Sequence, residues 1–178
     1  LIGIGAEIEQ NTCYWDTNYI VDGNHSEEYF VEKISYTIED SIRLQLRSDV
    51  PLGSHLSGGI DSSLVSKLAS DHLGSSIPLF HGKFSESPAY DESKYARIIS
   101  DATNGILYEV IPSAQEFVEI VPKLIYAMDE PVAGPGLFPQ YSVSKLAKEH
   151  VKVVLGGQGG DELFGGYNRY IFFNRFQK

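Results

Sequence analysis

Apolar residues recur at every fourth position in an early part of the chain, at Phe30, Ile34, Ile38 and Ile42. The residues between them are mostly polar or charged, so the apolar side chains share one face of a predicted helix. Ser26 is a preferred N-cap residue, and the two glutamates after it suit the first turn of a helix. The pattern predicts an amphipathic helix from Ser26 to about Arg47.

Short apolar runs alternate with amphipathic stretches through the rest of the chain. Buried strands are predicted at residues 50–57, 77–84, 105–112 and 151–157. Helices are predicted from about Ser62 and at residues 91–102, 113–128 (capped by Ser113), 138–150 and 161–176 (broken near Gly165 and Gly166). Strands separated by helices of about ten to fifteen residues are typical of βαβ units. We therefore expect an α/β fold, a doubly wound parallel sheet with helices on both faces.

The composition is that of an ordinary globular domain. With 178 residues, of which 42% are hydrophobic, the chain can bury a single-domain core. Acidic residues outnumber basic ones by 24 to 14, and the Lys and Arg residues form no block. Because phosphate contacts require such basic residues, we expect no nucleic-acid partner. Local binding of a small anion by backbone amides and a metal ion stays open.

Cys13 is the only cysteine, which excludes an intramolecular disulfide and any Cys-x-x-Cys site. This cysteine usage favours a reduced, cytoplasmic setting. No apolar run approaches the roughly 18 residues of a membrane span, so we expect no membrane partner.

A glycine-rich turn stands between a predicted strand and a predicted helix in the stretch SHLSGGIDSSLVSKLA, residues 54–69. Gly58 and Gly59 leave backbone N–H groups open to a ligand, and the following helix adds its free amides and positive end. Three serines, Ser57, Ser62 and Ser63, add hydroxyl donors that suit a phosphate or pyrophosphate. Asp61 fits such a site if a divalent cation bridges it to phosphate oxygens.

A second glycine-rich turn, in the stretch VVLGGQGGDELFGGY, has the same arrangement of strand, glycines and acidic residue later in the chain. Its glycines again follow an apolar strand and again precede an acidic pair, Asp161 and Glu162. In open parallel sheets ligands bind at the carboxyl ends of the strands. Two aspartates at neighbouring strand ends, Asp61 and Asp161, could therefore hold one or two Mg²⁺ ions on the phosphates of a nucleotide.

Neither of the commoner phosphate-binding loops is present. A Walker A loop needs Gly-Lys followed by Ser or Thr, but Phe84 follows Gly82 and Lys83. A Rossmann fingerprint needs a third glycine, and Ile8 stands in that place after Gly3 and Gly5.

SGGIDSS resembles the pyrophosphate-binding PP-loop of N-type ATP pyrophosphatases, and VVLGGQGGDELFGGY resembles the second signature of the asparagine synthetase family. RSDVPLG, YDESKYAR and DEPVAGPGLFPQY fit the same family in order and spacing, and the similarity extends from CYWD to GGYNRY. The resemblance implies an adenine nucleotide alpha hydrolase-like fold and a reaction of ATP with a carboxylate. The carboxylate attacks the α-phosphorus, pyrophosphate leaves, and ammonia converts the acyl-adenylate to an amide, with release of AMP.

The resemblance also implies roles for individual residues. The leaving pyrophosphate would be held by Ser57, Gly58, Gly59, Asp61, Ser62 and Ser63. The adenosine would be lined by the backbone around His55, Gly82, Gly156 and Gly157. Mg²⁺ would be carried by Asp61 and Asp161, whereas Glu162, Asp129 and Glu130 would lie near the substrate or the metal.

Two departures from the family pattern bear on the acceptor. The second signature usually has a glutamate, credited with assisting the ammonia step, where this chain has Gln158, and a carboxamide takes no proton at neutral pH. Residues 133–136 also lack the polar side chains often found in aspartate-using members. The favoured reaction is the conversion of aspartate to asparagine. The alternative is that the chain belongs to a related enzyme that amidates a sugar carboxylate or closes a β-lactam. A nucleotide-binding module without chemistry is a third possibility.

Family members begin with a glutaminase domain that supplies the ammonia. We expect residues 1–25 to be a linker from such a domain and residues 26–178 to be the synthetase domain, truncated at its C-terminus and weakly active or inactive alone. The expected partners are ATP, a small carboxylate and ammonia, and a homodimer is left open.

Overall fold

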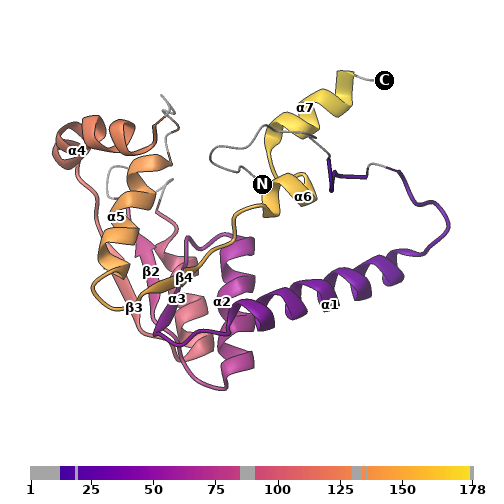
Figure 1. The fold of residues 1–178 in the computed structure, drawn as a ribbon, viewed down its shortest axis with the longest axis horizontal. Coiled ribbons are helices and arrows are strands. Elements are labelled where there is room, and N and C mark those ends of the chain that lie inside the picture. Colours follow the sequence, from indigo (N-terminus) through magenta and orange to yellow (C-terminus); the bar gives the residue numbers. More distant parts are fainter. Residues whose placement is uncertain (1–12, 19, 85–90, 130–133, 135, 177–178) are drawn as a thin grey trace, which may run out of the picture. The chain divides into compact units, whose positions relative to one another are not determined.

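A computed structural model describes residues 13–18, 20–84, 91–129, 134 and 136–176 (Figure 1). The chain divides into two compact units, Leu1–Ser35 and Tyr36–Lys178. The division falls within the first helix, α1 (Glu27–Gln45). The second unit contains every strand that the structure describes, and the candidate site is built within it.

The elements alternate as the sequence predicts. After α1 come β1 (Leu52–His55), α2 (Ile60–Leu73), β2 (Leu79–Gly82), α3 (Ser93–Thr103), β3 (Leu107–Val110), α4 (Ala114–Ala127), α5 (Leu137–Ala147), β4 (Val153–Leu155), α6 (Gly160–Phe164) and α7 (Asn168–Phe176). The expected break in the last helix is confirmed, since the backbone turns left-handed at Gly165, with a φ of 69°. The expected cap of α4 is also confirmed, because Ser113 and Glu116 form a reciprocal capping box.

The described strands form one parallel sheet in the order β3-β2-β1-β4. Ser54, at the centre, pairs with Leu79 of β2 on one side and with Leu155 of β4 on the other. Strands β1 and β4 are therefore direct neighbours although most of the chain separates them. Because parallel strands end at the same edge, the glycine-rich turns that follow β1 and β4 leave the sheet side by side.

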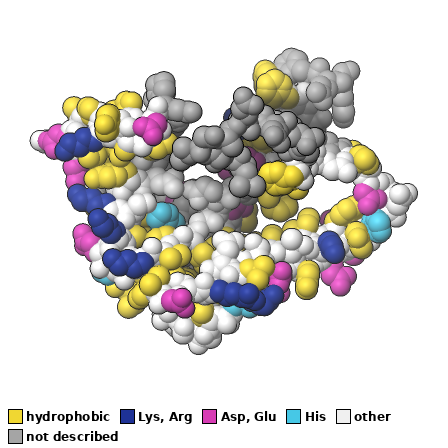
Figure 2. Space-filling view, in the orientation of Figure 1, with side chains coloured by type: hydrophobic (Ala, Val, Ile, Leu, Met, Phe, Trp, Pro, Cys, Tyr) yellow, Lys and Arg dark blue, Asp and Glu magenta, His cyan; other side chains and the backbone are white. Residues whose placement is uncertain are grey.

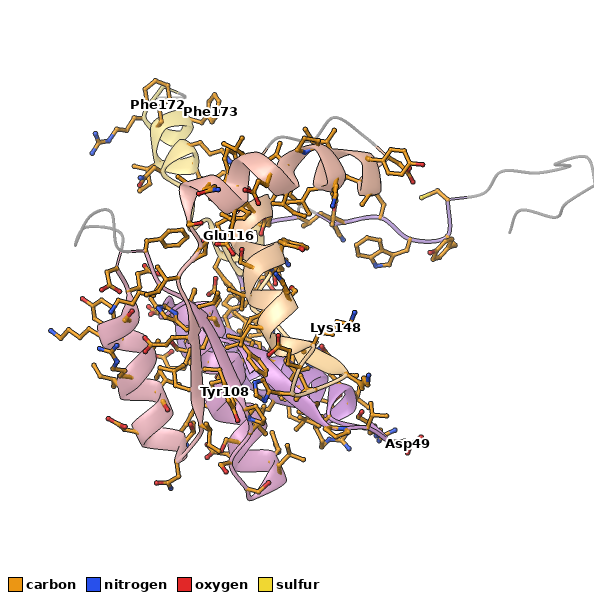
Figure 3. The ribbon with its side chains drawn as sticks, turned by 90° about the vertical axis from the view of Figure 1, so that its left-hand side faces the viewer. Asp49, Tyr108, Glu116, Lys148, Phe172 and Phe173 are labelled. Atoms are coloured by element: carbon orange, nitrogen blue, oxygen red, sulfur yellow. The ribbon has the colours of Figure 1, made fainter. Side chains whose placement is uncertain are left out.

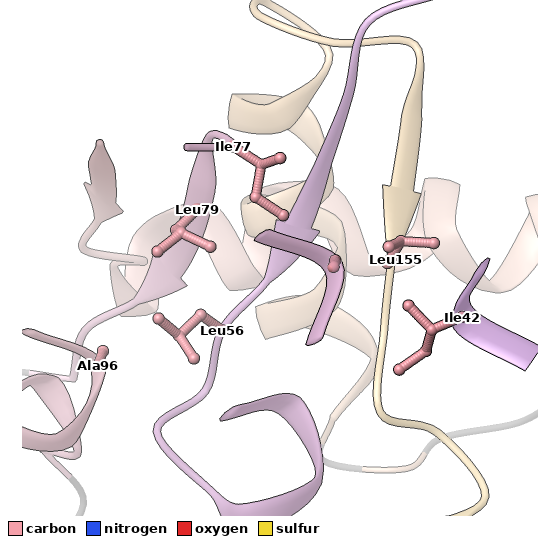
Figure 4. Packing of buried hydrophobic residues seen from close by; sticks show 7 residues of the cluster. Ile42, Leu56, Ile77, Leu79, Ala96 and Leu155 are labelled. Carbon is pink, nitrogen blue, oxygen red and sulfur yellow. The ribbon is translucent and has the colours of Figure 1, made fainter. Parts of the chain in front are cut away.

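Helices cover both faces of the sheet, which confirms the expected fold class. On one face, α2 and α3 pack over a core of Ile42, Leu56, Ala69, Ile77, Leu79, Ala96 and Leu155 (Figure 4). On the other face, Val143 and Ala147 of α5 pack with Phe80 of β2 and with Val151. Successive residues of a strand point to opposite faces, so β2 contributes Leu79 to one core and Phe80 to the other.

The outer parts of the second unit are less buried. Tyr108 lies on the outer strand β3, and Glu116 lies at the start of α4, which has no buried residue (Figure 3). Acidic, basic and apolar side chains are interspersed over the face drawn in Figure 2. Within the described ranges, no helix has both the length and the apolarity needed to cross a membrane.

Candidate functional site

The first glycine-rich turn connects β1 directly to α2. The helix begins at Ile60 rather than near Ser62, because Gly59 has the extended backbone of an N-cap, with a φ of −72° and a ψ of 164°. The amide of Ser63 donates to the carbonyl of Gly59 over 3.1 Å, which closes the first helical turn. Asp61 and Ser62 therefore lie inside that turn, at the positive end of the helix.

Two serine hydroxyls brace the turn from within. Ser57 Oγ lies 2.9 Å from Ser62 Oγ and accepts from the amide of Gly59 over 3.2 Å. The amide of Ser57 in turn donates to Ser62 Oγ over 3.2 Å. Ser62 is buried, whereas Ser63 is half-buried. The hydroxyls thus hold the shape of a turn that the sequence predicts as an anion site.

Gly58 has a backbone conformation that favours glycine, with a φ of 96°. A β carbon at this position would lie 2.8 Å from the carbonyl oxygen of Glu92 and 3.2 Å from Cβ of Tyr95. The turn therefore rests directly on the start of α3, and no side chain fits between them.

The second glycine-rich turn packs against the first through its glycines. A β carbon on Gly157 would lie 2.7 Å from the amide nitrogen of Ser62 and 2.9 Å from Cβ of Asp61. A β carbon on Gly160 would collide with the Asp61 carboxylate. The structure thus brings Asp61 against the residue that precedes Asp161.

The two acids of the second turn are held by residues that follow them. The Asp161 carboxylate lies where a β carbon on Gly166 would stand, and the amide of Gly166 donates to the Asp161 carbonyl over 3.0 Å. The Tyr167 hydroxyl donates to Glu162 Oε1 over 2.6 Å and thereby lowers the pKa of the Glu162 carboxyl from its ordinary 4.5. Glu162 is therefore a carboxylate at neutral pH.

A pocket of about 250 Å³ opens beside the first turn, on the α5 side of the sheet. Its lining combines apolar side chains with a few polar groups, which is typical of small-molecule sites. The lining residues are His55, Leu56, Ser57, Phe80, Gly82, Phe84, Glu92, Gly136, Pro139, Gln140, Val143 and Gln158. Of the residues predicted to surround the adenosine, His55 and Gly82 lie here.

His55 carries a buried polar atom without a partner. Its Nε2 makes no hydrogen bond although it is shielded from solvent. Burial of the ring lowers the pKa of His55 below its ordinary 6.5, so the imidazole is neutral at pH 7. A buried polar atom without a partner costs free energy, which a ligand that bonds to it would recover.

Other predicted residues lie apart from the pocket lining or outside the described ranges. Gly156 packs against the Gln158 side chain. A β carbon on Gly156 would lie 2.5 Å from Gln158 Oε1. Asp129 is exposed after α4 and has a positive φ of 59°. Glu130 lies outside the described residues.

Sequence reasoning missed part of the pocket and one buried histidine. Phe84, Pro139 and Gln140 line the pocket, yet no motif marked them as ligand contacts. His81 is 1% exposed and bonds to the Leu56 carbonyl just after β1 and to the Ser93 hydroxyl at the start of α3. The signal that could have found His81 is a polar residue inside the apolar strand that precedes Gly82.

The donor set for a metal ion is small. Within the described ranges, no group of three or more His, Cys, Asp and Glu side chains lies close enough to hold a metal ion. Magnesium is usually bound by one or two carboxylates together with the phosphate oxygens of a substrate. A site with only one or two carboxylates is therefore compatible with a magnesium ion that arrives with a nucleotide.

Comparison with known proteins gives one consistent family. The sequence matches the Asparagine synthase family over residues 33–176. It is 39% identical over 147 residues to a putative glutamine-hydrolysing asparagine synthetase of Mycobacterium bovis, covering 83% of this chain and 22% of that protein. It is 40% identical over 144 residues to the glutamine-hydrolysing asparagine synthetase 1 of Bacillus subtilis, covering 81% of this chain and 22% of that protein.

The chain thus spans about a fifth of the length of these relatives. Asparagine synthetase B of Escherichia coli is 28% identical over 156 residues, covering 80% of this chain and 28% of that protein. Among solved structures, an NH3-dependent NAD synthetase from Campylobacter jejuni aligns over 77% of this chain and 60% of its own, with 19% identity and a TM-score of 0.49.

Proposed function

The chain belongs to the asparagine synthase family, and we propose that it is the part of a glutamine-dependent enzyme that activates a carboxylate with ATP for amidation. The favoured acceptor is aspartate, with asparagine, AMP and pyrophosphate as the products. Ammonia would come from glutamine hydrolysed in a separate domain, to which residues 1–25 are the linker. Residues 26–178 would then be the first part of the synthetase domain.

The observation that carries this proposal is the contact between the two glycine-rich turns. Asp61 follows β1, Gly160 precedes Asp161 after β4, and only a glycine fits against the Asp61 carboxylate. Bare backbone, a helix N-terminus and two acidic residues thus meet at one edge of the sheet. This combination suits a polyphosphate with a divalent cation better than it suits a neutral ligand.

In the proposed reaction the first turn binds the leaving group. Negative charge grows on the pyrophosphate as its bond to the α-phosphorus breaks. The positive end of α2 would offset that charge, while the Gly59 amide stays bonded to Ser57 Oγ. The hydrogen bonds between Ser57 and Ser62 hold the turn in place beforehand, so little reorganisation is needed.

Asp61 and Asp161 would hold the magnesium ion on the phosphates. The bound ion supplies positive charge that polarises the phosphoryl oxygens. The two carboxylates would determine where the ion binds. The Asp61 carboxylate packs against Gly160, and the Asp161 carboxylate packs against Gly166.

The pocket beside the turn would receive the adenosine. Phe80, Phe84 and Val143 supply apolar surface, and His55 lines the same pocket. Because the pocket adjoins Ser57, a nucleoside bound there would place its phosphates towards the first turn.

The amidation step requires a proton acceptor for ammonia. The Gln158 side chain lines the pocket, and its carboxamide can orient a substrate but takes no proton at neutral pH. Water or another base therefore accepts the proton. This residue is also the observation that favours the second candidate, a related enzyme that amidates a sugar carboxylate or closes a β-lactam.

The test uses the full-length protein with ATP, Mg²⁺, ammonia and a panel of carboxylates, and pyrophosphate release is followed. Release that depends on aspartate supports the leading proposal, and release with another acid supports the second candidate. If none of the acids supports release although ATP binds, both candidates are contradicted, and the result indicates a nucleotide-binding module without chemistry. As a control, Asp61→Ala should weaken ATP binding and reduce pyrophosphate release.

A further inference from the structure

His81 is a buried, fully hydrogen-bonded histidine with no part in the reaction proposed above. It lies on β2, and because successive strand residues point to opposite faces, its side chain points to the same face as Leu79, the face covered by α2 and α3. It is 1% exposed, and each ring nitrogen has one partner. An apolar residue could fill the same space, so the two hydrogen bonds are what distinguish a histidine at this position.

The first partner is the carbonyl of Leu56, the residue that follows β1 and leads into the glycine-rich turn. His81 Nδ1 lies 2.8 Å from the carbonyl oxygen of Leu56. The amide of Leu56 still pairs with the carbonyl of Phe80, over 2.8 Å, but the chain leaves the sheet at Ser57. Because a carbonyl only accepts, Nδ1 carries the proton and donates to it. The imidazole thus holds the chain at the point where the turn begins.

The second partner is the first residue of α3. His81 Nε2 lies 3.1 Å from Ser93 Oγ, and Ser93 is itself 1% exposed. With the Nδ1 proton donated to Leu56, Nε2 can accept a hydrogen bond from the Ser93 hydroxyl. The amide of Ser93 also donates to Asp91 Oδ1 over 3.0 Å, so both bonds fix the start of α3.

The start of α3 is the surface on which the turn rests. Gly58 lies against the carbonyl of Glu92 and against Tyr95, with no room for a β carbon. His81 therefore holds the turn from two sides. Through the Leu56 carbonyl it holds the residue just before the turn. Through the Ser93 hydroxyl it holds the start of α3, against which Gly58 packs.

We propose that His81 is a positioning residue that holds the first glycine-rich turn in its ligand-binding shape, through the Leu56 carbonyl and the Ser93 hydroxyl. This inference rests on the proposed function, in which the turn binds the phosphates of ATP. A turn already held in shape loses less conformational freedom when the nucleotide binds. Loss of either bond should therefore weaken MgATP binding although neither residue touches the ligand.

The two partners can be separated by substitution. Ser93→Ala removes the bond to α3. Its matched control is Ser100→Ala, which removes a hydroxyl that donates to the Gly105 carbonyl over 2.8 Å at the other end of the same helix. His81→Asn keeps an amide N–H near the position of Nδ1, whereas His81→Leu keeps volume but removes both bonds.

The experiment measures the dissociation constant for MgATP and the melting temperature of each variant of the full-length protein. We expect Ser93→Ala to weaken MgATP binding about tenfold, the effect of one lost buried hydrogen bond. Ser100→Ala should lose comparable thermal stability and bind MgATP as the wild type does. His81→Asn should bind more tightly than His81→Leu.

Equal MgATP affinity of Ser93→Ala and Ser100→Ala would overturn the proposal, and so would equal affinity of His81→Asn and His81→Leu. If His81→Leu does not fold, the comparison of Ser93→Ala with Ser100→Ala is sufficient to test the proposal. A wild-type protein that binds no MgATP would refute the proposed function, whereas wild-type binding with equal serine variants would refute only the role of His81.

Discussion

The carboxylate of Asp61 occupies the space that a β carbon on Gly160 would need. Asp61 belongs to the turn after β1, and Gly160 belongs to the turn after β4. The two turns are far apart in the sequence and neighbours in the sheet. Their contact is what makes the two glycine-rich motifs a single site.

Gly160→Ala should therefore displace the Asp61 carboxylate. A methyl group forced into a packed place typically costs about 1–3 kcal/mol, and a comparable loss of MgATP binding energy would be about 5- to 150-fold in affinity. Isothermal titration with MgATP measures the effect. Gly23→Ala is the control, because a β carbon at Gly23 meets nothing within 4 Å. Wild-type affinity in the Gly160 variant would show that the Asp61 position is unimportant.

Gly58→Ala should weaken both stability and nucleotide binding. The left-handed backbone, with a φ of 96°, costs about 1–2 kcal/mol for a residue with a β carbon. The new methyl group would also press on the Glu92 carbonyl. Gly74→Ala is the matched control, because Gly74 has a φ of 61° but open space around it. Urea unfolding should show a loss in both variants, and only the Gly58 variant should bind MgATP less tightly.

Asp61→Asn should remove the magnesium dependence of ATP binding while it keeps the size of the side chain. An amide is a much poorer ligand for Mg²⁺ than a carboxylate. The control is Asp71→Asn, on the same helix, whose carboxylate pairs on the surface with Lys67. ATP affinity is measured over a range of Mg²⁺ concentrations. ATP affinity should still depend steeply on the Mg²⁺ concentration in the Asp71 variant and only weakly in the Asp61 variant. A steep dependence in both variants would show that Asp61 is not a magnesium ligand.

His55 should titrate below pH 6.5, because burial disfavours its charged form. Below that pH the unfolded chain takes up a proton that the folded chain resists. Stability should therefore be unaffected by His55 above pH 6.5 and should fall as the pH drops from 6.5 towards the folded pKa. Imidazole proton resonances, assigned with His55→Asn, give the pKa directly. A value at or above 6.5 would contradict the buried, neutral state of this ring.

Much of the fold could be predicted because the signals were local. The apolar strand before Ser57 and the helix-forming run after it define a strand, a turn and a helix, and the break at Gly165 required only adjacent glycines. The start of α2 was misplaced because Gly59, without a side chain, caps the helix through its backbone. That choice depends on backbone angles rather than on residue type.

The pocket and the buried histidine could not be predicted in the same way. Gln140 reaches the pocket from α5, while Phe84 follows β2, and only the packing of helix on sheet brings them together. His81 and Ser93 likewise belong to different elements. Periodicity shows which face of an element is buried but not which element lies opposite. The resemblance to a family named the motif residues, and the structure supplied their contacts.

The most direct test of the central claim follows an oxygen atom. Aspartate labelled with ¹⁸O in its side-chain carboxylate is incubated with the full-length protein, ATP, Mg²⁺ and ammonia, and the AMP is analysed by mass spectrometry. If a carboxylate oxygen attacks the α-phosphorus, ammonia later displaces that oxygen with the phosphorus, so AMP carries one ¹⁸O atom per turnover. AMP without the label, or label in inorganic phosphate, would contradict activation through an acyl-adenylate.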